Sequence, residues 1–296
     1  MKHRGSPDIA NSILVVVLAL FALACVYPLY SVYIYAFNDG LDSMRAPLIL
    51  FPRQPTLSNF EAAFSQRNIV NSINVSVLRT AVGTILALLA TSMLGYAMMM
   101  RKIAGYKFFS YFFFITFLFS GGFIPSFLLI RELGMLNTFW VLVVPGMISY
   151  WYMIIFRSFF DGIPTSIMES VEVDGASYFT TFFCIYMPLS KPVFAAVGLF
   201  VAVGHWNDWF VGEFYIMTDN LKPLQTLLRN LMQRANLLDQ LMNQNVGSLA
   251  ASMSAGVTPY AIRVAIVVIS VTPIIFVYPF LQKHFVKGLM IGSIKG

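Results

Sequence analysis

The sequence predicts an all-α protein that crosses a membrane six times, and three observations support this fold class. Of the 296 residues, 58% are hydrophobic and only 11% are charged, whereas soluble domains carry roughly 25% charged residues. Six mostly apolar runs are each close to the ~20 residues that span a bilayer. Lysine and arginine gather in alternate connections between the runs. This composition excludes a disordered chain, a fibrous protein and almost any soluble enzyme.

The six apolar runs are the predicted spans, and they occupy residues 13–37, 71–100, 108–130, 139–156, 192–217 and 261–281. The first run is too long for the core of a signal peptide, and no small-residue cleavage site ends it. The Gly121–Gly122 pair predicts a soft point in the third span, and Pro145 predicts a kink in the fourth. We expect the whole chain, residues 1–296, to form a single membrane domain.

Positive charge predicts which side the termini face. Six crossings place both termini and the loop after the second span on one side. That side carries Lys2, Arg4, Arg101, Lys102, Lys107, Lys283, Lys287 and Lys295. Because lysine and arginine accumulate in cytoplasmic loops, we expect both termini in the cytoplasm. The loop after the fourth span departs from the trend, since its acids outnumber its bases.

Two long connections fall on the opposite side. Residues 38–70 contain three prolines, which predicts an irregular segment with one short helix at residues 58–64. Residues 218–258 contain apolar residues at helical spacing over 224–241, with arginines between them. That pattern predicts an amphipathic helix on or in the outer mouth of the protein.

The acidic loop, residues 163–190, predicts a helix–turn–helix outside the membrane. Ser166 and Glu169 have the spacing of a capping box, and Glu169 and Glu172 share a helix face. Gly175 suits the left-handed residue that ends a helix, and several aromatic residues follow it. Exposed apolar surface rimmed by charge favours a docking surface. The alternative is a cap over the cytoplasmic end of the chain itself.

The same loop resembles the EAA loop of ABC importer permeases. The matching residues are Glu169, Asp174, Gly175 and Ala176, then Ile185, Met187, Pro188, Leu189 and Pro192. Ser170 and Val171 stand where the motif name has two alanines. In that family the loop forms a coupling helix in a groove of the ATPase subunit. The resemblance implies that coupling involves Glu169, Glu172, Asp174, Gly175, Ala176 and Pro188, with Glu169 paired to a basic residue of the ATPase.

Two further segments resemble carbohydrate importers. The tail at residues 285–296 is similar to that of the smaller maltose-type permease subunits, and residues 206–209 resemble carbohydrate members of that group. The resemblance implies a type I ABC importer permease fold in a bacterial cytoplasmic (inner) membrane, and an oligosaccharide as substrate. It implies three kinds of partner: a second permease subunit, two ATP-binding cassette subunits and an extracytoplasmic sugar-binding protein. In the tail, Lys287 and Lys295 either face the ATPase or only follow the charge rule for cytoplasmic segments.

Charged and aromatic residues within the predicted spans mark a possible substrate path. Arg79 lies about 12 Å into the second span at 1.5 Å per residue, and Asp208 and Glu213 lie in the outer part of the fifth. Buried charges must face protein or water, so these groups either pair across helices or line an outer cavity. The two tryptophans either stack on sugar rings or form an interfacial belt. The candidate set is Arg79, Trp206, Asn207, Asp208, Trp209 and Glu213.

Motifs for catalysis are missing from the sequence. It contains no phosphate-binding glycine loop, no His-Glu-x-x-His and no Gly-x-Ser-x-Gly, and its two cysteines and three histidines are scattered. We expect no catalytic residue, metal site, bound cofactor or nucleic-acid partner; ATP and magnesium are used by the partner ATPase. The alternative class is a secondary transporter driven by an ion gradient. Such carriers usually couple through ionisable groups near the midplane, whereas the charges here lie toward the outside.

Overall fold

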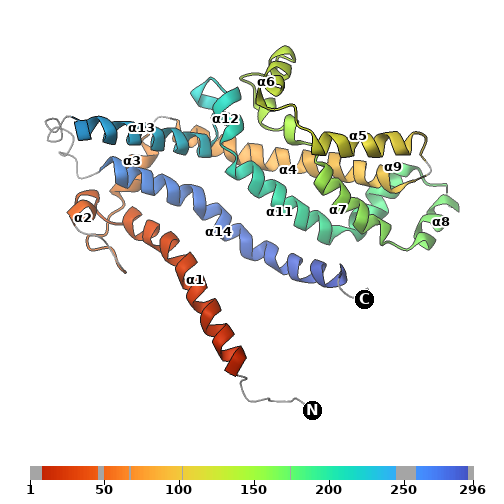
Figure 1. Ribbon diagram of the computed structural model, residues 1–296, viewed down its shortest axis with the longest axis horizontal. Helices are drawn as coiled ribbons and strands as arrows, with labels where there is room; N and C mark the ends of the chain where they lie inside the picture. Colours follow the sequence, from red (N-terminus) through yellow and green to blue (C-terminus); the bar gives the residue numbers. More distant parts are fainter. Residues whose placement is uncertain are drawn as a thin grey trace. The chain divides into compact units, whose positions relative to one another are not determined.

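The computed structural model describes residues 9–45, 50–66, 68–101, 103–173, 175–244 and 258–292, and most of these residues are helical (Figure 1). The chain divides into two compact units. Unit 1 comprises residues 1–67 and 230–272, and unit 2 comprises residues 68–229 and 273–296. The expectation of one membrane domain over residues 1–296 stays a prediction.

Three helices are long and apolar enough to cross a membrane, namely α1 (Ile9–Ala36), α4 (Ile69–Met99) and α14 (Pro259–Gly292). They correspond to the first, second and sixth apolar runs. In α14 the qualifying stretch is Pro259–Val277. Their backbones satisfy their own hydrogen bonds, which is what a lipid environment requires of a spanning segment.

The other three candidate spans are broken helices. The bent pairs are α5 (Tyr106–Leu118) with α6 (Phe123–Glu132) at 117°, the 3-10 turns η1 (Phe139–Leu142) and η2 (Val144–Gly146) with α7 (Tyr150–Asp161) at 51°, and residues 178–189 with α11 (Lys191–Asn207) at 84°. The described residues therefore contain three spanning helices, or up to six spans if each pair forms one. The predicted soft point coincides with the first break, where Gly122 has φ +85°.

The fifth predicted span, residues 192–217, is not continuous. Helix α11 ends at Asn207, and α12 (Phe210–Tyr215) begins after two non-helical residues. The 3-10 turn η4 (Asp219–Leu221) then leads into α13 (Leu224–Gln244). The amphipathic helix predicted for residues 224–241 is confirmed, with its first residue as expected. Residues 245–257 of the predicted outer loop lie outside the described residues.

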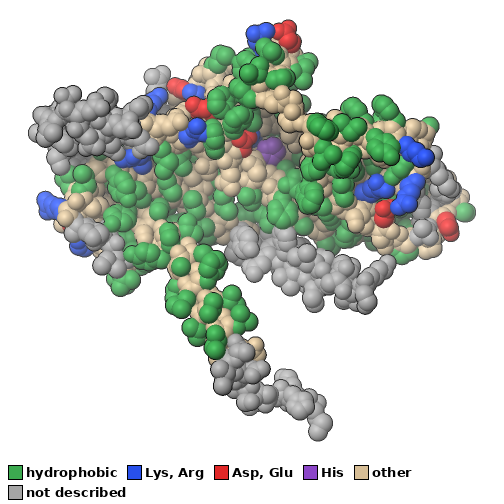
Figure 2. Space-filling view, viewed as in Figure 1, with side chains coloured by type: hydrophobic (Ala, Val, Ile, Leu, Met, Phe, Trp, Pro, Cys, Tyr) green, Lys and Arg blue, Asp and Glu red, His purple; other side chains and the backbone are tan. Residues whose placement is uncertain are grey.

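Unit 1 contains α1, α2 (Gly40–Arg45), α3 (Ser58–Phe64) and the start of α14. Hydrophobic side chains cover α1 (Figure 2). The short helix predicted at residues 58–64 is confirmed as α3. The loop before it is held by a buried side chain, because Asn59 Nδ2 donates to the carbonyls of Ala36, at 3.0 Å, and Asn38, at 2.7 Å. Carbonyls at a helix end lack intrahelical partners, so Asn59 closes the end of α1.

In unit 2, α4 packs against α7 and α11 (Figure 1). The buried face of α4 carries mainly small and polar residues at helical spacing: Ser72, Ser76, Arg79, Gly83, Ala87, Thr91 and Gly95. Small side chains let helices approach closely within a membrane. The polar residues on this face can also form hydrogen bonds with the interrupted helices beside α4, which a purely apolar face could not do.

Candidate functional site

Arg79 lies at the centre of the polar groups in unit 2, and its side chain is only 2% exposed. Its Nε donates to the carbonyl oxygen of Leu142 at 2.9 Å, and its Nη1 donates to the carbonyl oxygen of Asp208 at 2.9 Å. Its Nη2 forms an ion pair with Asp208 Oδ2. Residues at helix ends leave carbonyls without partners, and one guanidinium satisfies such carbonyls at two breaks. Of the two alternatives that the sequence left open, the structure shows the ion pair.

The break between α11 and α12 is satisfied from several directions. Asp208 Oδ1 accepts from the backbone N–H groups of Phe210, at 2.8 Å, and Val211, at 3.3 Å, as a helix N-cap does. Thr226 Oγ1, from α13, donates to the carbonyl of Trp209 at 2.9 Å. Two successive carbonyls of the interrupted span thus receive donors from α4 and α13, so the break is a constructed feature rather than a frayed end.

Other polar residues of α4 serve the same purpose. Thr91 Oγ1 donates to the carbonyl of Met147, at 3.1 Å, between η2 and α7. Ser76 Oγ accepts from the N–H of Leu224, at 2.8 Å, where α13 begins. Unsatisfied backbone groups cost several kcal/mol in an apolar medium. The unbroken helix α4 therefore carries side chains that satisfy the backbone groups left unpaired at the breaks in its neighbours.

The aromatic candidates differ in exposure. Trp206 is 8% exposed and lies on the packed face of α11, so its ring is not available to a sugar in this conformation. Trp209 is half-buried. The guanidinium carbon of Arg229 lies 3.2 Å from the centroid of its ring, and Phe210 approaches it edge-on at 5.7 Å and 68°. The face expected to stack on sugar is occupied by the chain's own side chain.

The remaining candidates of the fifth span lie beside this break. Asn207 is exposed. Glu213 lies on α12, and its Oε2 is buried without a hydrogen-bond partner among the described residues. No cluster of three potential metal ligands occurs among the described residues.

The acidic loop begins with α8 (Thr165–Val173). This helix starts one residue before Ser166, so the predicted cap lies inside the first turn. Glu169 is exposed, and Val173 is 87% exposed. Ser166, Glu169, Ser170 and Val173 line a shallow open depression. Asp174 and the side chain of Glu172 lie outside the described residues.

The end of α8 has the predicted glycine turn. Gly175 has φ +69°, a left-handed conformation that is costly for residues with a Cβ. The N–H of Ala176 donates to the carbonyl of Val171 at 3.2 Å, which is the long bond of a Schellman motif. The structure therefore supplies a reason for the glycine at 175.

The second half of the loop comprises α9 (Tyr178–Thr181), the π-helical turn η3 (Phe182–Tyr186) and α10 (Met187–Leu189). Ser177 Oγ accepts from the N–H of Thr180 at 3.2 Å and caps α9. Phe182 and Tyr186 are buried in an aromatic cluster with Tyr96 of α4. Pro188 lies in α10, just before the chain bends into α11. The loop is thus anchored to the spans rather than free.

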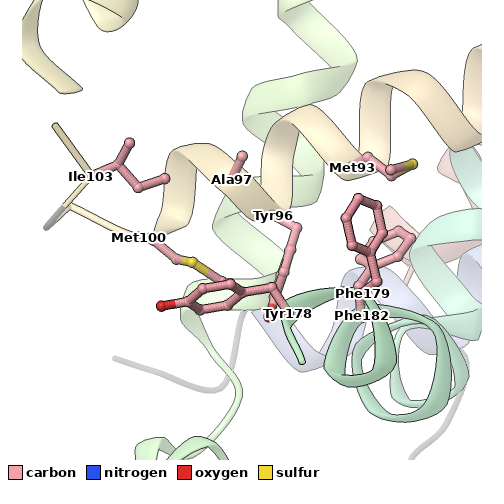
Figure 3. A pocket seen from close by; sticks show the side chains of 8 residues that line it. All are labelled: Met93, Tyr96, Ala97, Met100, Ile103, Tyr178, Phe179 and Phe182. Carbon is pink, nitrogen blue, oxygen red and sulfur yellow. The ribbon is translucent and has the colours of Figure 1, made fainter. Parts of the chain in front are cut away.

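An apolar pocket of about 390 Å³ separates the end of α4 from α9 (Figure 3). Met93, Tyr96 and Ala97 of α4 face aromatic side chains of the acidic loop across it, with Met100 and Ile103 beyond the helix end. Tyr178 and Phe179 on its rim are 66% and 65% exposed. The sequence indicated the exposed aromatics but not the pocket, because its other wall comes from a distant span.

The two tail lysines are only partly covered by the structure. Lys287 lies within α14, but its side chain is outside the described residues. Lys295 lies wholly outside them.

Comparison with known proteins gives a consistent family. Residues 105–291 match the family described as binding-protein-dependent transport system inner membrane component. The chain is 34% identical over 281 residues to the polygalacturonan/rhamnogalacturonan transport system permease protein YtcP of Bacillus subtilis. The aligned region covers 94% of this chain and 96% of that relative. It is 28% identical to the arabinooligosaccharides transport system permease protein AraQ of Halalkalibacterium halodurans, over the full length of both.

A solved structure has the same architecture. It is a chain of a bacterial ABC transporter involved in the import of the acidic polysaccharide alginate, and it superposes with a TM-score of 0.82 at 25% identity. The superposition covers 96% of this chain and 99% of that chain.

Proposed function

The chain belongs to the family of binding-protein-dependent transport system inner membrane components, and on this premise we propose that it forms half of the pore of a carbohydrate importer and couples that pore to a separate ATPase. It is a permease subunit of an ABC importer, a multi-pass protein of the bacterial inner membrane, and not itself an enzyme. Its relatives are named for oligosaccharide and polysaccharide transport, which supports a carbohydrate, in particular an oligosaccharide, as the substrate.

We infer that α8 is the coupling helix. Three features support this role: an exposed acid at Glu169, an exposed apolar residue at Val173, and a rigid turn at Gly175. A groove in a partner would cover the depression around Glu169 and bring a basic side chain to its carboxylate, a charge-assisted contact. Glu172, and Asp174 next along the sequence, would add negative charge to the same segment of the chain.

The pocket between the end of α4 and α9 extends the proposed ATPase-binding surface on α8. It is lined by apolar and aromatic side chains and opens beside two exposed rings, Tyr178 and Phe179. We propose that the ATPase covers it in the assembled transporter. Because Phe182 and Tyr186 anchor the loop to α4, a displacement of α8 by the ATPase would be transmitted to the spans as a rigid-body movement. Lys287 and Lys295 would reach the same partner from the tail.

The proposed function also implies an orientation in the membrane and a set of partner subunits. We propose that both termini face the cytoplasm, as the positive charges predict. Two ATP-binding cassette subunits would then bind on that side, one for each permease, and a second permease would complete the pore. An extracytoplasmic sugar-binding protein would deliver substrate to the opposite side, where α13 and the break at Asp208–Trp209 would lie. In this arrangement the ion pair of Arg79 and Asp208 would stabilise the broken spans beside the path, and the buried Trp206 would pack within the same unit.

The test uses Glu169→Ala and Gly175→Asp in the reconstituted importer. Glu169 is exposed, so its loss removes a contact without opening a cavity. Gly175→Asp places a Cβ at positive φ and costs on the order of 1 kcal/mol. We expect membrane insertion to be unchanged. Sugar uptake and ATPase stimulation by the loaded binding protein should fall at least about tenfold in Glu169→Ala, as the loss of a charge-assisted contact predicts. They should fall about fivefold in Gly175→Asp, the equivalent of about 1 kcal/mol. Glu132→Ala, which removes an exposed acid at the end of α6, serves as the matched control.

Survival of uptake and stimulated ATPase activity in both variants would refute the coupling role. A different result would favour the secondary transporter: uptake into vesicles that contain this chain and an ion gradient but no ATPase. The exposed dock argues against that class, because a self-contained carrier has no use for it.

A further inference from the structure

Arg229 of α13 lies on the ring of Trp209, at the break between α11 and α12. Unlike the hydrogen bonds described above, this contact does not satisfy a backbone group at the break. Trp209 is bound twice from α13, through its carbonyl by Thr226 and through its ring by Arg229. Thr226 and Arg229 are three residues apart and therefore share a helix face. The hydrogen bond from Thr226 fixes the distance at which Arg229 meets the ring.

The approach of the two helices is built for this contact. Gly212 of α12 faces Pro223 and Thr226 so closely that a Cβ there would lie 2.2 Å from Thr226 Oγ1. The N–H of Leu224, at the start of α13, is held by Ser76 Oγ at 2.8 Å. The start of α13 is therefore locked onto α4 and α12, and Arg229 is presented from a rigid position.

Arg229 has no carboxylate partner in the part of the chain that the structure describes. The ion pairs there join Arg53 to Asp42, Arg79 to Asp208, Arg131 to Glu132, Arg157 to Asp161 and Lys222 to Asp219. The acid next to Trp209, Asp208, is already taken by Arg79. A guanidinium held on an aromatic face keeps the N–H groups at its edge available. These can bind a carboxylate through two parallel hydrogen bonds.

We propose that Arg229, seated on Trp209, binds the carboxylate of an acidic oligosaccharide, so that the importer carries sugars that contain uronic acid. This inference rests on the proposed function in carbohydrate import and adds the charge of the substrate. The named proteins differ in the charge of their substrates: polygalacturonan and the acidic polysaccharide alginate carry carboxylates, whereas arabinooligosaccharides are neutral. A neutral sugar would instead use a bare tryptophan face for stacking, and here that face carries the guanidinium.

The experiment compares two probes with the same sugar backbone, namely trigalacturonate, which carries carboxylates, and its fully methyl-esterified form, in which each carboxylate is a neutral methyl ester. Uptake is measured in proteoliposomes that contain the complete importer with its binding protein, at a probe concentration below half-saturation, where the rate depends on affinity. We expect Arg229→Gln to lower uptake of the acid by roughly tenfold or more, the effect of losing hydrogen bonds to a charged group. Uptake of the ester should stay within about twofold, as for a surface substitution. Arg229→Lys should rescue the acid only partly, because lysine lacks the bidentate fork.

Arg234→Gln is the matched control, since Arg234 is an exposed arginine on the same helix; we expect it to change neither rate. An equal fall of acid and ester uptake in Arg229→Gln would show that the pair is only structural and would overturn the proposal. A wild-type importer that carries the ester but not the acid would overturn it as well. Failure of the proposed function looks different: no carbohydrate of either charge would be taken up, and none would stimulate the ATPase.

Discussion

Replacement of Arg79 by methionine tests the claim that this residue stabilises two helix breaks. The change keeps an apolar stem of similar length but removes all three donors. It leaves the Asp208 carboxylate, whose side chain is 27% exposed, without its cation, and it leaves the carbonyls of Leu142 and Asp208 without donors. Breaking a buried pair costs about 3–5 kcal/mol, and each unsatisfied buried carbonyl costs about 1–3 kcal/mol.

Because Asp208 keeps some contact with solvent, the lower ends of these ranges apply, and they give about 5 kcal/mol. This is a large part of the ~5–15 kcal/mol by which folded domains are stable. We therefore expect Arg79→Met to lower the thermal midpoint of the purified complex strongly, measured by scanning fluorimetry and by size exclusion after heating. Arg131→Met is the matched control; its ion pair with Glu132 is exposed and should be worth at most about 1 kcal/mol.

The double variant Arg79→Met/Asp208→Asn sharpens the test. Asparagine still caps α12, since it also accepts hydrogen bonds at an N-cap, and it removes the stranded charge. The double variant should therefore be more stable than Arg79→Met alone, by about 2–3 kcal/mol, as expected for coupled neighbours. If Arg79→Met melted with the wild type, or if the second substitution lowered the midpoint further, the account of Arg79 would be wrong.

Two further predictions concern the start of α13 in unit 2 and the loop after α1 in unit 1. Gly212→Ala should weaken the seat of α13, because the new Cβ would lie 2.2 Å from Thr226 Oγ1 and 2.6 Å from Pro223 Cδ; overpacking of this kind costs about 1–3 kcal/mol, and cysteine-accessibility labelling on α13 should increase. In unit 1, hydrogen bonds from Asn38 and Arg53 hold the pKa of Asp42 below its ordinary value. The ionised carboxylate therefore stabilises the loop at pH values above the ordinary pKa. This contribution is lost as the pH falls through the lowered pKa. The difference in thermal midpoint between wild type and Asp42→Asn should accordingly be present at pH 7 and shrink in acid below pH ~4; a difference that persists unchanged there would contradict the ionic role of Asp42.

The local features of the fold could be predicted from the sequence because they depend on short-range patterns. Apolar runs located the three unbroken spans, and helical spacing located α3 and α13. The glycine at 175 followed from the conformation that ends a helix, and the structure confirms it. The acidic loop was recognised by its composition, because it carries acidic and aromatic residues. A loop that only joins two membrane spans requires neither.

The breaks in the other spans could not be predicted in this way. Hydropathy is the same for a straight and a broken helix, and a break is stable in lipid only if donors and acceptors arrive from elsewhere. The donor for Asp208 comes from Arg79, more than a hundred residues earlier in the chain. The sequence therefore showed the charges but left open whether they pair, line a cavity or do both.

What the sequence by itself determined is the class of protein: a polytopic permease with an acidic loop that resembles the EAA loop, since composition, charge distribution and the loop motif are properties of the chain in one dimension. Only the tertiary structure decided which tryptophan is buried and which carries Arg229, and which residues of α4 face the acidic loop across the apolar pocket. Both depend on how helices rotate and pack, and that is set by side chains that meet only after the chain has folded.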